Sequence, residues 1–139
     1  MTSHWTTSPT CDVKTGVFDR FPELHVAWIE IGVGWLPHFI EMLDDKYWRN
    51  RSWGELPIGE PPSTYWYRNC AASYIMDRSG VALRHAVGVE NMMWSSDYPH
   101  HGNDWPYSRK VIEDTMGHIP VSEKQLITGG NAARIWNID

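Results

Sequence analysis

Apolar residues gather along this chain in blocks whose lengths fit strands and helices. Residues 24–31 form a mainly apolar run with β-branched and aromatic side chains, which is typical of a strand buried on both faces. Residues 65–76 form a second run of this kind, and residues 92–95 form a third, shorter one. The pattern therefore predicts three buried strands.

A helix is predicted between the first and second strands. Pro37 fits its first turn, where the missing N–H of proline costs nothing. Apolar side chains recur on one face with the spacing i, i+3, i+4 and i+7, at Leu36, Phe39, Ile40 and Leu43. Residues 50–63 carry three prolines and two glycines without a period, so we expect a long loop there, of the kind that often lines a site.

A further helix is predicted between the second and third strands. Asp77 or Ser79 is expected to cap its beginning. Gly88 is expected to end it after Val87 in a left-handed conformation, which glycine adopts without steric cost.

Two helices are predicted after the third strand. Pro106 is expected to open the first, with an inner face made by Val111, Ile112 and Met116. Residues 122–125 have the S-x-x-Q pattern of a capping box, in which two side chains satisfy the free N–H groups of a helix start. This pattern is expected to open the last helical segment.

The predicted order β-α-β-α-β-α-α belongs to the α/β class, because strands that alternate with helices favour a parallel sheet. A complete eight-stranded α/β barrel needs about 250 residues. Residues 16–139 are therefore predicted to form a partial barrel domain of about three βα units. Residues 1–15 are polar and aperiodic, and we expect a disordered terminus or the remnant of a longer segment.

Composition narrows the functional classes. A formal net charge of -5 without a basic stripe argues against nucleic acid as a partner. Cys11 and Cys70 lack the C-x-x-C spacing and are expected to be reduced structural thiols, which suits a cytoplasmic protein. Neither a signal peptide nor an apolar run of about 18 residues is present, so no membrane association is expected. The nine tryptophans suit pocket walls as well as a core, and the core is favoured.

Acidic and histidine side chains follow two of the predicted strands. Glu30 comes at the end of the first, and Asp97 with His100 and His101 comes just after the third. Because ligands bind at the carboxyl ends of parallel strands, these side chains are expected to face the same rim. An aspartate directly after an apolar strand needs a metal, an arginine or hydrogen bonds to compensate its charge.

Structural interpretations of the two carboxylates stay open beside the functional one. Asp97 can cap the following segment through an Asx turn, with the next Tyr-Pro pair continuing as an ordinary turn. Glu30 can form a salt bridge with an arginine such as Arg20 or Arg68.

The histidines do not form a self-contained metal motif. His100 and His101 are expected to point in different directions, so that at most one faces a ligand at the rim. His25 is expected to be a satisfied core or rim residue, and the others are expected at the surface: His4, His38, His85 and His118. The sequence contains no H-x-H, no HExxH and no G-x-S-x-G motif.

Three stretches carry a combination of motifs that is specific when taken together: residues 16–44 (GVFDRFPELHVAWIEIGVGWLPHFIEMLD), 91–106 (NMMWSSDYPHHGNDWP) and 127–136 (ITGGNAARIW). With them the chain resembles the amidohydrolase-related family, which includes aminocarboxymuconate-semialdehyde decarboxylase. The resemblance implies the C-terminal part of a distorted (β/α)₈ TIM barrel that holds one divalent metal, usually zinc. It implies hydrolysis of C–N or C–O bonds, or decarboxylation, with a small organic acid, amide or ester as substrate.

The resemblance also assigns roles to residues. Asp97 matches the aspartate that follows the last strand, binds the metal and handles a proton. Glu30 stands where decarboxylase-like members carry a histidine, and it is expected to act as an oxygen ligand or hydrogen-bonding group. With His100, these two residues are the predicted catalytic set.

The family's H-x-H pair and its histidine on a middle strand have no counterpart here. The chain alone is therefore expected to be inactive and to bind zinc only in a completed barrel. The alternative is a non-catalytic partial barrel that acts as an association or scaffold module and pairs with itself or another chain through its open sheet edge.

Overall fold

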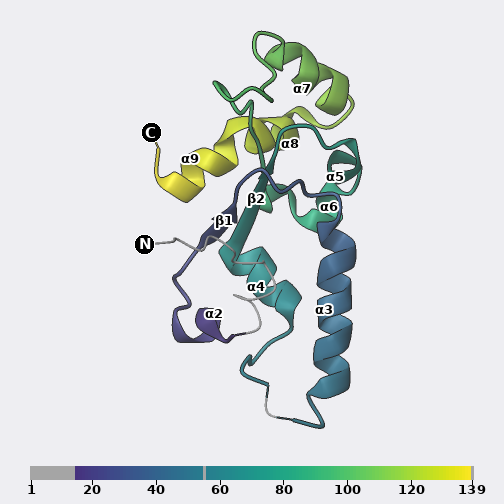
Figure 1. Ribbon diagram of the computed structural model, residues 1–139, viewed down its shortest axis with the longest axis vertical. Coiled ribbons are helices and arrows are strands. Elements are labelled where there is room, and N and C mark those ends of the chain that lie inside the picture. Colours follow the sequence, from purple (N-terminus) through teal and green to yellow (C-terminus); the bar gives the residue numbers. More distant parts are fainter. Residues whose placement is uncertain (1–14, 55, 139) are drawn as a thin grey trace. The chain divides into compact units, whose positions relative to one another are not determined.

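Three strands form one sheet, in the order β1-β2-β3, in the computed structural model of the chain, which describes residues 15–54 and 56–138 (Figure 1). β2 and β3 run parallel, with Ala72 opposite Met92 and Tyr74 opposite Trp94. In chain order the elements are α2 (Val17–Arg20), β1 (Val26–Trp28), α3 (Leu36–Asn50), α4 (Pro62–Asn69), β2 (Cys70–Tyr74), α5 (Arg78–Ala82), α6 (Arg84–Val87), the 3₁₀ helix η1 (Val89–Asn91), β3 (Met92–Trp94), α7 (Ser108–Met116), α8 (Val121–Gln125), the π-helix η2 (Leu126–Gly130) and α9 (Asn131–Trp136). The predicted α/β class is confirmed.

The chain divides into two compact units. The first consists of residues 1–26 and 38–70, and the second consists of residues 27–37 and 71–139. All of the sheet except the first residue of β1 and of β2 belongs to the second unit. The strand ends that carry the predicted site residues therefore lie together in one unit.

In the first unit, α3 buries the predicted apolar face. Ile40, Leu43 and Tyr47 are buried at the spacing i, i+3 and i+7. The ring of Phe18 in α2 stacks on the ring of Tyr65 in α4, with 6.0 Å between the ring centroids. Burial and the hydrogen bond from its hydroxyl to Asp19 raise the pKa of Tyr65 to about 12. This cluster fixes the start of α4.

The second predicted strand is wrong over its first half. Residues Pro62–Asn69 form α4, and only Cys70–Tyr74 form β2. The buried side chains of α4 lie at i, i+3, i+4 and i+7, namely Pro62, Tyr65, Trp66 and Asn69. Asp44 accepts a hydrogen bond from the free N–H of Ser63 in the first turn. A short apolar run fits a strand and a buried helix equally well, and here the preceding prolines and this cap decide for the helix.

Several predicted boundaries also shift. β1 is shorter than the predicted strand, and the helix predicted to run through Val87 is interrupted at Leu83 between α5 and α6. Its predicted cap is confirmed, because Asp77 accepts a hydrogen bond from the N–H of Gly80 at 2.7 Å. Gly88 follows α6 as predicted, but with a φ of 99° and a ψ of 108° it lies outside the left-handed helical region that was expected.

The C-terminal helices begin at other residues than predicted. α7 starts at Ser108, two residues after Pro106. The capping box is wrong, because α8 already begins at Val121 after Pro120, and no side chain caps its first turn. Ser122 is therefore the second residue of α8 and not the residue that precedes the helix. From α8 the chain continues through η2 into α9.

The core of the second unit surrounds the sheet. Met92, Met116 and Ile127 are fully or almost fully buried, and the Tyr74 hydroxyl lies 3.4 Å from the sulfur of Met116. Burial raises the pKa of Tyr74, with a further contribution from the charge of Asp77. Side chains from the strands and from the C-terminal helices thus share one core.

Most of the described tryptophans are exposed, so the core interpretation is wrong for the majority. Trp28 and Trp66 are buried, whereas five others are exposed: Trp35, Trp48, Trp53, Trp105 and Trp136. Cys70 is buried. Cys11 and His4 lie outside the described residues.

The other histidines outside the rim are exposed. His38, His85 and His118 lie at the surface as predicted. His25 precedes β1 rather than lying within it, is exposed, and bonds the carbonyl oxygen of Glu23 through its ring at 3.0 Å. Among the described residues, no helix combines the length and apolar character that crossing a membrane requires.

Candidate active site at the strand ends

Glu30 lies two residues beyond the end of β1 in a left-handed backbone conformation, with a φ of 61°. Its N–H donates a hydrogen bond of 2.8 Å to Oγ of Ser73 in the neighbouring strand β2. A left-handed residue with a side chain costs on the order of 1 kcal/mol and persists only where its surroundings hold it. The bond to Ser73 is one such restraint.

Asp97 occupies the corresponding place after β3. The N–H of Ser95 donates to the carbonyl of Tyr74 and extends the ladder beyond β3 by one bond of 2.9 Å. Asp97 then adopts a φ of 57°, and its N–H donates to Oγ of Ser95 at 3.1 Å. Two strands of one sheet thus end in the same way, with an acidic residue in the left-handed region.

The carboxyl groups of Glu30 and Asp97 meet at this edge of the sheet. A hydrogen bond between the side chains of Glu30 and Asp97 is the largest of the causes that raise the pKa of Glu30, followed by desolvation and by the negative charge of Asp97. The charge of His100 acts in the opposite direction. Two carboxyl oxygens can share a hydrogen bond only through a proton, so the pair favours a state in which Glu30 is protonated.

His100 holds the other side of Asp97. Its Nδ1 lies 2.8 Å from Oδ2 of Asp97, whose side chain is only 13% exposed. A turn brings the two residues together, because the N–H of His100 donates to the carbonyl of Asp97 at 2.7 Å. The carboxylate therefore bonds an imidazole, and the described residues give no sign of the Asx turn that was the structural alternative.

The rings of His100 and His101 lie against each other, with 4.1 Å between their centroids. This differs from the expectation that consecutive histidines point in different directions. The turn closed by the His100 N–H and the carbonyl of Asp97 leads into this pair, whose imidazoles lie on the same side. Both histidines are exposed, and of the two His100 is the one that contacts Asp97.

The same loop folds back onto its own beginning. The N–H of Asp104 donates to the carbonyl of Ser96 at 3.2 Å, which closes the loop around Asp97. Desolvation raises the pKa of Asp104, and its buried Oδ2 has no hydrogen-bond partner among the described residues. Sequence reasoning missed Asp104, although its position seven residues after Asp97 in the same loop was a usable signal.

Asp77 shows that an acidic residue after a strand can also be purely structural. It follows β2, and its Oδ2 accepts hydrogen bonds of 2.7 Å from the N–H groups of Val33 and Gly34. Its Oδ1 caps α5 through Gly80. Both carboxylate oxygens of Asp77 thus bind backbone N–H groups. The packing around this cap is tight, because a Cβ on Gly80 would come within 2.3 Å of the side chain of Val33.

The alternative partners of Glu30 are engaged elsewhere. Arg20 donates to the carbonyl of Gly16 and lies over the ring of Phe21. Arg68 donates to Oδ1 of Asn69. Of the two interpretations of Glu30, the one that directs it to the rim with Asp97 is therefore supported by the contacts that Glu30 makes.

The chain matches one protein family and several solved structures. The family model described as Amidohydrolase matches residues 6–138. The chain belongs to the amidohydrolase family. No curated protein matches the chain.

Solved structures of decarboxylases and an amidohydrolase share the fold of this amidohydrolase-family chain. The 5-carboxyvanillate decarboxylase of Sphingomonas paucimobilis is 32% identical with a TM-score of 0.73, over 92% of this chain and 38% of that enzyme. An amidohydrolase of Mycobacterium avium subsp. paratuberculosis K-10 is 21% identical with a TM-score of 0.76, over 91% of this chain and 32% of that protein. The dihydroxybenzoic acid decarboxylase of Polaromonas sp. JS666, solved with bound manganese and 2-nitroresorcinol, is 18% identical with a TM-score of 0.68, over 91% of this chain and 37% of that enzyme.

The chain thus spans less than two fifths of the length of these three structures. This share agrees with the prediction that the chain is part of a barrel, because the described residues form a sheet of three strands and a complete barrel has eight. The complete active site of such a barrel draws on strands beyond these three.

The donors at the rim fit a divalent metal in kind but not in number. Carboxylate oxygens are common ligands of zinc and manganese, and two neighbouring carboxyl groups gain most from a cation between them. Yet residues 15–54 and 56–138 contain no group of three or more His, Cys, Asp or Glu side chains that could hold a metal ion. Asp97 and Glu30 therefore make up part of a metal site at most.

Proposed function

We propose that this chain contributes the Asp97 rim of a metal-dependent active site that hydrolyses or decarboxylates a small organic acid, amide or ester. The observation that carries the proposal is the meeting of Glu30 and Asp97 at the ends of two strands, each in a left-handed conformation. A fold has no need of two adjoining carboxyl groups in strained backbone, so the arrangement favours a chemical role.

Asp97 is the proposed metal ligand and proton carrier. Its side chain is shielded from solvent. Nδ1 of His100 lies 2.8 Å from its Oδ2 and fixes the orientation of the carboxylate. A bound divalent cation would supply charge stabilisation and an activated water. Zinc is the metal we expect, and manganese is the metal of one similar decarboxylase.

Glu30 is the proposed second acid. The neighbouring Asp97 raises the pKa of Glu30, which widens the pH range over which this carboxyl group holds a proton. In its protonated form, this carboxyl group can deliver a proton to a leaving group or to a carbon that loses carbon dioxide. His100 completes the set by orienting Asp97, and its exposed ring lies where a substrate would enter.

The remaining ligands must come from barrel strands other than the three described here. This inference rests on the small number of metal-ligand side chains at the rim, among the described residues, and on the share of the similar structures that the chain covers. The chain alone is accordingly expected to bind zinc or manganese weakly and to turn over neither aromatic acids nor esters.

Metal titration by calorimetry tests the role of Asp97. Asp97→Asn keeps the shape and the backbone preference of the residue and should lower the affinity for zinc at least tenfold. Asp45→Asn is the matched control, because Asp45 pairs with Arg49 on an exposed helix and should leave the affinity unchanged. Equal affinities of wild type and Asp97→Asn would contradict the assignment of the ligand.

An activity assay tests the incomplete site. The purified chain is loaded with zinc or manganese and supplied with a panel of aromatic acids, esters and amides. Carbon dioxide or acid release should appear only when the missing strands of a family barrel are added in trans. Stoichiometric tight zinc together with turnover by the chain alone would overturn the claim that the site is shared.

A non-catalytic association module remains the second candidate, and the shortage of metal donors among the described residues is what favours it. The two candidates separate in the same assay. An association module binds the added strands without any release of product.

A further inference from the structure

The loop after Asp97 is cross-linked by the side chain of Asn103. The amide Nδ2 of Asn103 donates a hydrogen bond to the carbonyl of His100. The amide Oδ1 accepts a hydrogen bond of 2.8 Å from the N–H of Trp105. Asn103 thus connects the histidine that contacts Asp97 with the far end of the same loop.

Only one of these two bonds belongs to a common loop motif. A bond from an asparagine oxygen to the N–H two residues later is an Asx turn, which many loops contain. The bond from Nδ2 runs backward to His100 and is not part of such a turn. It joins a longer bond of 3.2 Å, which the backbone N–H of Asn103 donates to the same carbonyl. The side chain therefore adds a restraint on His100 that the Asx turn does not need.

The backbone of His100 is held on both sides of its Cα. Its N–H donates to the carbonyl of Asp97 at 2.7 Å, and its own carbonyl accepts the two bonds from Asn103. Because both flanking peptide groups are bound, the direction in which the imidazole leaves the backbone is fixed. This direction brings Nδ1 to 2.8 Å from Oδ2 of Asp97.

The contact between His100 and Asp97 needs this support. The side chain of His100 is 56% exposed. Exposed pairs of this kind contribute little by themselves, because water competes for both partners and the side chains lose rotational freedom. An imidazole held only by its bond to the carboxylate would therefore spend much of its time in solvent.

We propose that Asn103 is a positioning residue of the candidate site, whose amide holds His100 where its ring bonds Asp97. The chemical purpose of this arrangement rests on the proposed function, in which Asp97 binds the metal. Groups that orient a metal-binding side chain raise the affinity of a site without touching the metal. Asn103 acts in this way one step further out, through His100.

The position of the proton on the His100 ring tests the proposal. An ionised carboxylate only accepts hydrogen bonds, so a neutral His100 beside Oδ2 of Asp97 carries its proton on Nδ1. A free imidazole favours a proton on Nε2 instead. Long-range ¹H–¹⁵N spectra of the labelled chain in EDTA at alkaline pH distinguish the two forms. The signal that disappears in His100→Gln is that of His100.

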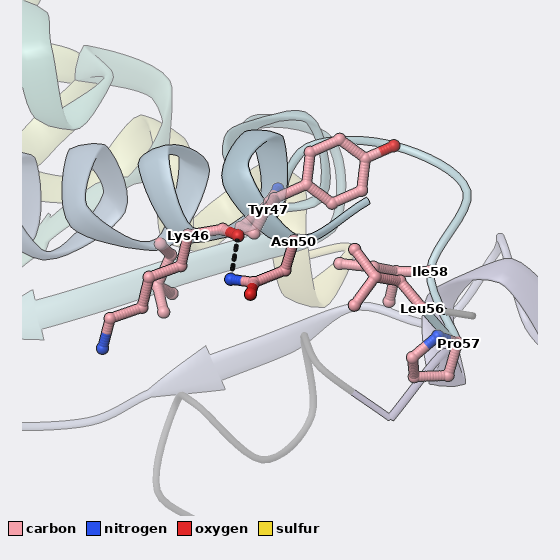
Figure 2. Close-up of a pocket in the computed structure, with 8 residues that line it drawn as sticks. Lys46, Tyr47, Asn50, Leu56, Pro57 and Ile58 are labelled. Atoms are coloured by element: carbon pink, nitrogen blue, oxygen red, sulfur yellow. Dashed lines mark hydrogen bonds between the residues drawn. The ribbon is translucent and has the colours of Figure 1, made fainter. Parts of the chain in front are cut away.

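Two variants separate the bonds of Asn103. Asn103→Ala removes both, whereas Asn103→Asp keeps the acceptor for Trp105 and removes the donor to His100. Both should shift the ring towards the Nε2 form by roughly 2- to 12-fold, as the loss of one hydrogen bond does to an equilibrium. Asn50→Ala is the matched control, because Asn50 is an exposed asparagine of the first unit that donates to the carbonyl of Lys46 at 2.7 Å (Figure 2). It should leave the His100 signal unchanged.

A purely structural Asn103 leads to a different result. Its loss would lower the melting temperature in circular dichroism but leave the His100 ring of the folded chain as in wild type. An unchanged His100 signal in Asn103→Asp would overturn the proposal. This outcome is decisive even where Asn103→Ala does not fold, because Asn103→Asp retains the Asx turn.

Zinc titration by calorimetry distinguishes a failure of this proposal from a failure of the proposed function. Asn103→Ala should lower the zinc affinity about twofold or more, and by less than Asp97→Asn does. If Asp97→Asn weakens zinc binding and Asn103→Ala does not, the positioning role is wrong and the proposed function stands. If Asp97→Asn leaves the affinity unchanged, the proposed function fails, and the ring proton of His100 alone decides the role of Asn103.

Discussion

The two ends of strands β1 and β3 carry opposite kinds of polar side chains. Before β1, the buried amide of Asn69 donates to the carbonyls of Pro22 and Leu24 at 2.8 Å each. Before β3, the buried amide of Asn131 donates in the same way to two main-chain oxygens, those of Val89 and Met92. Neutral side chains thus satisfy the backbone where the strands begin.

At the other ends of these strands lie Glu30 and Asp97, which are acidic and adopt left-handed backbone conformations. The residues at the amino ends thus stabilise the fold, whereas those at the carboxyl ends, a few residues away, carry the proposed chemistry. It agrees with the general division in α/β barrels between a stabilising amino-terminal face and a reactive carboxyl-terminal face. Mutations at the two ends should therefore fail in different ways.

The largest loss of stability is expected at the exception to this division, Asp77 after β2. Asp77→Ala removes the acceptor of three backbone N–H groups, those of Val33, Gly34 and Gly80. Hydrogen bonds to a charged group contribute roughly 1.5 to 3 kcal/mol each, so we expect a loss of about 3 kcal/mol or more in urea unfolding. A loss below about 1 kcal/mol would mean that the loop after β1 is held by other contacts.

The next largest effect is expected at the amino ends. Asn69→Ala leaves the carbonyls of Pro22 and Leu24 without this donor and should cost about 2 kcal/mol. Asn131→Ala also leaves two carbonyls without their donor, but it removes a buried Oδ1 that has no hydrogen-bond partner among the described residues, so its cost should be smaller. Thermal unfolding of both variants measures the difference, and an equal or reversed order would contradict this account of the orphaned oxygen.

A gain is expected at a carboxyl end. Asp97→Gly relieves a left-handed residue with a φ of 57° and should stabilise the metal-free chain by up to about 1 kcal/mol. Asp97→Asn is the control, since asparagine keeps the strain and should change stability less. If Asp97→Gly unfolds as readily as the variants at the amino ends, the comparison between the two ends fails.

The smallest effect is a change in pH dependence at Glu30. Because Asp97 raises the folded-state pKa of Glu30 above its ordinary 4.5, the stabilising contribution is complete below pH 4.5 and is lost as pH rises through the raised value. Glu30→Gln should therefore be the more stable protein at pH 7 and lose this advantage below pH 4.5. Urea midpoints of the two proteins in EDTA across this range provide the measurement, and a constant difference would contradict the coupling.

The sequence predicted what depends on local pattern. The amphipathic spacing of α3, the cap at Asp77 and the short β3 before Asp97 all follow from residues close together in the chain. The carboxylate rim was also within reach, because two acidic residues each follow an apolar run and parallel strands end at one edge. Residues 65–69 were misassigned, since a short apolar run does not distinguish a strand from a buried helix.

Other features were decided only by the tertiary structure. The contact between Glu30 and Asp97 joins residues 67 positions apart (97 minus 30), and no local pattern states their distance or their backbone strain. The exposure of Trp53 likewise depends on what packs around it and not on its residue type. The sequence by itself determined which residues carry charge and which follow strands, because periodicity and chemistry are local properties. The tertiary structure decided which of them meet, because long-range contacts are set by packing alone.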